Sequence, residues 1–181
     1  YLYDSVKEVF VQEGKVEQAR FSSDDNKTLR PEEQEIVNRA LARARRIFNK
    51  KPNLNQAYRI SAATLLAVHG EEDALQYLNK LTETNDLFTQ LTGVASLYQA
   101  GKEIPTEILR LGLQSDDRSI RVFAAALSGV TGYRDDTSVL NQLLNDRAAE
   151  YSAPAAVALA RLGNREIIPK HLSQDFALLD F

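Results

Sequence analysis

Residues 124–132 read AAALSGVTG, and three other stretches of the chain match this one at a fixed spacing. The matching stretches are AATLLAVHG at 62–70, GVASLYQAG at 93–101 and AAVALARLG at 155–163. The four final glycines stand 31 residues apart, at Gly70, Gly101, Gly132 and Gly163. A fixed period in the range of about 20 to 50 residues is the signature of stacked repeat units.

The apolar residues of each repeat have helical spacing. Leu stands four positions before three of the glycines, and eight positions after three of them. Because spacings of 3, 4, 7 and 8 mark one face of a helix, each unit predicts a helix, a glycine stop and a second helix. We expect helices near 55–68, 73–83, 87–100, 105–113, 119–131, 136–145, 149–162 and 165–172. The predicted fold is all-α: a right-handed α-solenoid of stacked antiparallel helix pairs with a 31-residue period.

The four glycines are predicted to be structural turn residues. A helix commonly ends at a residue with positive φ, where glycine avoids a clash of its Cβ. Pro154 interrupts the pattern of its helix, so we expect it either to begin the regular helix or to kink it.

The ends of the chain fit the repeat pattern less well. We interpret 1–31 as an N-terminal segment in which 1–21 form a helix, with a hairpin as the alternative, followed by a polar loop. The repeat array then covers 32–181, and the helix 32–50 caps its amino-terminal end. The apolar tail 176–181 has three explanations: the natural chain continues, the tail folds back over the last layer, or it docks on something else.

Residues 115–127 read SDDRSIRVFAAAL, and this stretch resembles the HEAT-like repeat of bacterial proteins, the type found in phycobilin lyases. The resemblance covers 85–169 clearly and 54–84 less closely. Arg59 and Arg121 occupy the arginine position of the family, whereas Gln90 and Ser152 replace it. The resemblance implies an armadillo-like solenoid that serves as a scaffold, and it admits an enzyme or enzyme subunit of the lyase kind.

Composition excludes several classes of function. The 22 basic and 25 acidic residues give a net charge of −3. Residues 52–181 contain 11 basic and 16 acidic groups, a net charge of −5, which disfavours nucleic acid as a partner. No apolar run approaches the roughly 18 residues needed to span a bilayer. The chain has no Met, which predicts a trimmed or processed form, so we expect a soluble protein that is cytoplasmic or exported.

No catalytic constellation, metal site or cofactor site is predicted. His69 and His171 occupy non-equivalent positions of the repeat and lack nearby ligands, so we interpret His69 as a helix-end residue and His171 as a core replacement. Acidic pairs begin the second helix of two repeats and the first helix of another. Because they recur at turns, we interpret the pairs at 71–72, 116–117 and 135–136 as helix caps rather than as acid–base groups.

Two surfaces are candidates for binding a partner. The second helices of a solenoid usually line its concave side, and their outward residues are rich in amides. These residues are Gln76, Asn79, Lys80, Glu83, Glu107, Arg110, Gln114, Asn141, Gln142 and Asn145. A row of bases at helical spacing, which also fits the dipole of its helix, is a candidate docking strip for anions. This row comprises Arg39, Arg43, Arg46 and Lys50. Among the tyrosines, Tyr133 is predicted to be the most exposed.

The sequence therefore favours a non-catalytic scaffold that binds a protein or peptide of unknown identity on a concave helical face. One alternative is an enzyme resembling the HEAT-like phycobilin lyases, which would need a pigment pocket. The other is a HEAT-type nucleic-acid-binding protein, which would need a basic face lined with aromatic residues.

Overall fold

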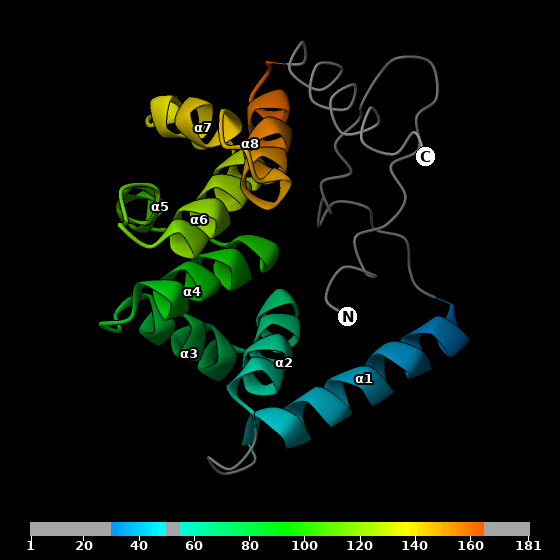
Figure 1. The fold of residues 1–181 in the computed structure, drawn as a ribbon. Coiled ribbons are helices and arrows are strands. Elements are labelled where there is room, and N and C mark those ends of the chain that lie inside the picture. The colour runs from blue at the N-terminus through cyan, green and yellow to red at the C-terminus, as the bar shows by residue number, and fades with distance from the viewer. Residues whose placement is uncertain (1–29, 50–54, 165–181) are drawn as a thin grey trace. The chain divides into compact units, whose positions relative to one another are not determined.

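A computed structural model describes residues 30–49 and 55–164 of the chain (Figure 1). These residues form eight α-helices and contain no strand, which confirms the all-α prediction for the described part of the chain. The predictions for 1–21, for the polar loop, for a helix at 165–172 and for the tail 176–181 lie outside the described residues.

The chain divides into two compact units, Tyr1–Val37 and Asn38–Phe181, and the division falls inside the first helix. In the first unit the described residues are 30–37, which are helical from Pro31 onward. The second unit contains the rest of that helix and the seven helices that follow. All of the packing described below belongs to the second unit.

Each predicted helix of the described region is present within two residues of its predicted ends. The helices are α1 (Pro31–Asn49), α2 (Gln56–Val68), α3 (Glu72–Thr82), α4 (Leu87–Gln99), α5 (Thr106–Leu113), α6 (Arg118–Thr131), α7 (Thr137–Leu144) and α8 (Ala149–Arg161). Pro154 lies inside α8, so it does not begin that helix.

The helices of the second unit pack in two series (Figure 1). Each of α2, α4, α6 and α8 contacts the next member of its series. The shorter helices lie beside this series: α3 contacts α2 and α4, α5 contacts α4 and α6, and α7 contacts α8. Their facing sides form an apolar core to which α4 through α8 all contribute, with Leu91, Leu109 and Leu140 almost completely buried.

The four repeat glycines follow α2, α4, α6 and α8 and adopt positive φ. The φ angles are 82° at Gly70, 67° at Gly101, 80° at Gly132 and 111° at Gly163. In each case the amide after the glycine donates to a carbonyl five residues earlier, at 2.9–3.0 Å. This bond from C″ to C3 is the Schellman arrangement that ends a helix. The four donor amides belong to Glu71, Lys102, Tyr133 and Asn164.

Replacing Gly132 by alanine is expected to lower the free energy of unfolding by about 1 kcal/mol, because L-residues are strained at positive φ. An added Cβ would meet no atom within 4 Å, so the loss is conformational and not steric. Gly132→Asn should lose less, since asparagine tolerates this region better. Urea denaturation of the three proteins measures the difference; equal losses for alanine and asparagine would contradict the explanation.

The starts of the longer helices share a second recurring device. Asn55 and Asp117 accept hydrogen bonds from backbone amides of the first turn of α2 and α6, and Asp86 does the same for α4. These three caps are again 31 residues apart. The fourth equivalent position is Ala148, whose amide donates to Oδ1 of Asp146 at 3.0 Å. Of these three caps, only Asp117 was predicted from the sequence, although the 31-residue spacing relates all three.

Candidate binding surface

The ten amide-rich residues predicted to face outward lie on α3, α5 and α7 or directly after these helices. Nine of them are exposed, and Arg110 is half-buried. The opposite sides of the same helices are buried, with Leu78, Leu109 and Leu140 inaccessible to solvent or nearly so. We call the outward side of α3, α5 and α7 the amide face.

Charged groups on the amide face are paired along α5. Nε of Arg110 donates to Glu107 at 2.8 Å, and Nη1 donates to the side-chain oxygen of Gln114 at 3.1 Å. The hydrogen bond between Arg110 and Glu107 lowers the pKa of the Glu107 carboxyl and raises the pKa of the Arg110 guanidinium. Both groups therefore stay charged near neutral pH. On α7, Asn141 and Asn145 each donate to a backbone carbonyl one turn earlier, at 3.0 and 2.9 Å. Local hydrogen bonds therefore orient part of this face.

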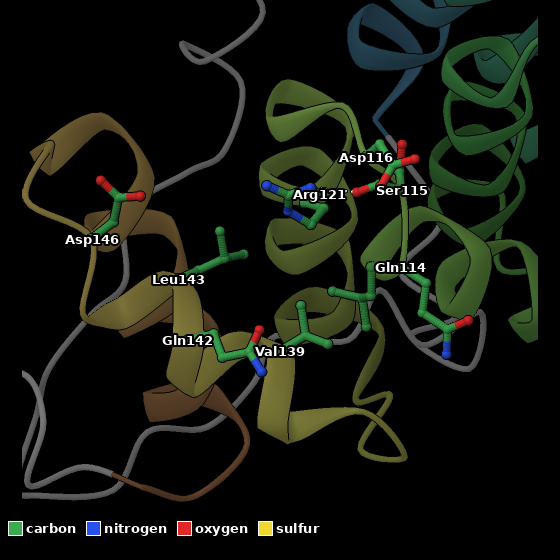
Figure 2. A pocket seen from close by; sticks show the side chains of 9 residues that line it. Gln114, Ser115, Asp116, Arg121, Val139, Gln142, Leu143 and Asp146 are labelled. Carbon is green, nitrogen blue, oxygen red and sulfur yellow. Dashed lines mark hydrogen bonds between the residues drawn. The ribbon is translucent and has the colours of Figure 1, made fainter.

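A cavity of about 420 Å³ opens where the end of α5, the start of α6 and the end of α7 meet (Figure 2). It is lined by Leu113, Gln114, Ser115, Asp116, Arg121, Val139, Gln142, Leu143 and Asp146. Gln114 and Gln142 also belong to the amide face, so the cavity is continuous with that face. We call it the Arg121 cavity.

Arg121 stands where the resemblance predicts an arginine, and its side chain bonds to the backbone of the preceding turn. Nη1 of Arg121 donates to the carbonyl of Ser115, in the turn that precedes its own helix. One repeat earlier, Nε2 of Gln90 donates to the equivalent carbonyl of Thr84 at 2.7 Å. A neutral amide thus makes the same bond to the turn as the guanidinium does. The last equivalent residue, Ser152, is buried.

Arg59, the other arginine at this position, lies against two aromatic rings. Its guanidinium carbon is 4.6 Å from the ring centroid of Tyr77 and 5.5 Å from that of Phe48. The two rings pack edge to face, 5.5 Å apart. Within the described residues, the buried Nε of Arg59 has no hydrogen-bond partner, so ring contacts take the place of polar ones. This cluster joins the end of α1 to α2 and α3.

The predicted anionic docking strip is described in part. Arg39, Arg43 and Arg46 are exposed on α1, whereas Lys50 lies outside the described residues. Arg45, a neighbour that the strip did not include, donates through Nε to Glu71 at 2.6 Å. That ion pair ties α1 to the start of α3. It spans 26 residues, and no local pattern in the sequence indicates it.

The acidic pairs differ in what they do. Asp117 accepts amide hydrogens at the start of α6, as predicted for a cap. Glu71 and Asp136 stand at N-cap positions but form no side-chain capping bond. Their carboxylates have other partners: Glu71 pairs with Arg45, and Asp136 accepts the hydroxyl of Tyr133 at 3.3 Å. The capping interpretation therefore holds for one of the three pairs, because Arg45 from α1 and the neighbouring Tyr133 bind the carboxylates of the other two.

The prediction for the tyrosines is wrong. Tyr58 is 64% exposed and Tyr98 is 40% exposed, whereas Tyr133 is half-buried. Burial raises the pKa of the Tyr133 hydroxyl, and the nearby carboxylate of Asp136 raises it further. Tyr133 follows the glycine turn, and the turn directs its ring against the apolar core.

The two histidines and the acidic side chains form no metal-binding group in the described region. His69 is exposed and caps the carboxyl end of α2, and His171 lies outside the described residues. Among residues 30–49 and 55–164, no group of three or more His, Cys, Asp and Glu side chains could hold a metal ion. No described helix combines the length and the apolar character needed to cross a membrane.

The chain was compared with family models, curated proteins and solved structures. No family model, no curated protein and no solved structure matches the chain.

Proposed function

We propose that the protein is a non-catalytic scaffold of HEAT-like repeats, a right-handed α-solenoid whose amide face binds a protein or peptide partner. Three devices recur at intervals of 31 residues and support a repeat architecture. They are the positive-φ glycines, the hydrogen bonds that follow them, and the side-chain caps at the starts of α2, α4 and α6.

The observation that carries the proposal is the exposure of the amide face. Its side chains are amides and charges of both signs, and the apolar residues of the same helices are buried in the core. Amide groups offer both donors and acceptors, which suits hydrogen bonding to a peptide backbone or to a polar protein surface. An apolar small molecule would instead need a deep pocket with mainly apolar walls.

The test is affinity capture from cell extract with matched variants. The face variant carries Asn79→Ala, Gln114→Ala and Gln142→Ala. These are three exposed residues of the amide face, one each from α3 and α7 and one directly after α5. The control variant carries Gln56→Ala, Gln99→Ala and Arg161→Ala, which are exposed on α2, α4 and α8. Mass spectrometry of the captured proteins measures how much partner each variant retains.

We expect the control variant to retain the partner and the face variant to bind it at least about tenfold more weakly. Three lost side-chain hydrogen bonds at about 0.5–1.5 kcal/mol each account for that factor. Equal retention by both variants would contradict the assignment of the face. A tight complex with a small molecule or with DNA, and with no protein, would contradict the scaffold function itself.

A further inference from the structure

The Arg121 cavity contains a positive charge that the local fold does not require. The bond from Arg121 to the Ser115 carbonyl is made one repeat earlier by Gln90, a neutral residue. Arg121 is only half-buried, and among the described residues no carboxylate lies within ion-pair distance of it. In Figure 2 its side chain lies between the turn that carries Ser115 and the α7 residue Leu143.

The two carboxylates that line the cavity leave this charge uncompensated. Asp146 forms an ion pair with Arg118 through Oδ2 and accepts the Ala148 amide through Oδ1, so its charge is neutralised locally. Asp116 is exposed, and salt screens a charge in open solvent more than one partly removed from water. Arg121 is therefore the cation of the cavity lining that remains available to an anionic group.

The remaining walls favour a peptide over a free ion. Leu113 and Leu143 are buried side chains at the apolar part of the cavity, and Val139 stands beside them. Gln114 and Gln142 are exposed amides of the same cavity and of the amide face. The volume of about 420 Å³ is at the small end of the range of about 300–1,000 Å³ for ligand sites.

From these features we infer that the Arg121 cavity binds an acidic side chain, aspartate or glutamate, of a peptide segment of the partner. An apolar side chain next to that acid packs on Leu113, Val139 and Leu143, and the two glutamines hydrogen-bond the peptide backbone. A guanidinium suits this role because it offers several N–H donors, so one can remain on Ser115 while others face the carboxylate. The inference rests on the proposed peptide-binding function and names the chemistry that the partner presents.

The test uses random heptapeptides displayed on phage and selected on the full chain. Enriched sequences are then synthesised with acetylated and amidated ends, which removes the terminal carboxylate as a competitor. Fluorescence anisotropy measures their dissociation constants with wild type, with Arg121→Gln and with Arg161→Gln. Arg161 is exposed on α8 and provides a control with the same change in net charge. Gln90 shows that glutamine can make the backbone bond at this position of the repeat.

We expect the enriched peptides to share an acidic residue beside an apolar one. Arg121→Gln should weaken their binding about ten- to a hundredfold, the range for a hydrogen bond between charged groups, and Arg161→Gln should change it less than about twofold. Replacing the acidic residue of the peptide by its amide should weaken binding to the wild-type protein by a similar factor. The same peptide change should weaken binding to the Arg121→Gln variant little further. This peptide change supports the inference even if Arg121→Gln does not fold.

Two results would overturn the inference in distinguishable ways. Enriched peptides that show no preference for an acid, or that bind Arg121→Gln as tightly as wild type, would remove the acidic-residue site and leave the scaffold function standing. A selection that enriches no peptide on the wild-type chain would remove the inference together with the peptide binding on which it depends.

Discussion

Replacing Leu109 by alanine is expected to lower the free energy of unfolding by about 3 kcal/mol. The Leu109 side chain is fully buried on α5, within the cluster to which α4 through α8 all contribute. Truncation removes apolar contacts and leaves a cavity, because the surrounding side chains relax only in part. Urea denaturation followed by circular dichroism measures the loss.

The matched control lies on the same helix. Leu111 is 42% exposed, so Leu111→Ala should lower the free energy of unfolding by less than about 1 kcal/mol. The two variants remove the same atoms from one eight-residue helix and differ only in the face they alter. Losses of equal size would show that α5 does not present Leu109 to the core.

The second large effect is expected for Gly129→Ala, where α6 crosses α8. A Cβ at this position would lie 2.4 Å from Cα of Ala158 and 2.8 Å from its Cβ. The nearest of these atoms is backbone, so the two helices must separate. Overpacking of about 3 kcal/mol exceeds the gain of up to about 1 kcal/mol from replacing a helical glycine, so we expect a net loss of about 2 kcal/mol.

Thermal and urea unfolding of Gly129→Ala should be compared with the neighbouring change Val130→Ala. Val130 is 37% exposed, and its truncation should alter stability by no more than about 0.5 kcal/mol. Wild-type stability in Gly129→Ala would contradict the close crossing of α6 and α8.

The proposed binding face and the apolar core lie on the same short helices. The amide face and the core are opposite sides of α3, α5 and α7, whose buried leucines hold the polar residues in place. The proposed binding of a partner to this face would therefore depend on the packing of the buried leucines as well as on the exposed side chains.

The helices of the described region, and the glycines at which the longer helices end, could be predicted from the amino-acid sequence alone. Both depend on residues within one or two turns, and the 31-residue repeat presents each signal several times. The exposure of the amide face follows from the same periodicity, because a residue opposite the buried leucines of an amphipathic helix faces solvent. Local signals also contained the series of caps from Asn55 to Asp117, which agrees with the repeat spacing.

The contacts between side chains of different repeats could not be predicted from the sequence and are seen in the three-dimensional structure. Arg45 pairs with Glu71, Arg118 with Asp146, and Arg59 lies against Phe48 and Tyr77. The Arg121 cavity likewise combines residues from the ends of α5 and α7 with one from α6. Periodicity tells which way a side chain points from its own helix. Periodicity does not give the distance to the neighbouring helix or identify the charged side chain of that helix that makes the contact. Close packing of small residues, such as Gly129 against Ala158, sets that distance.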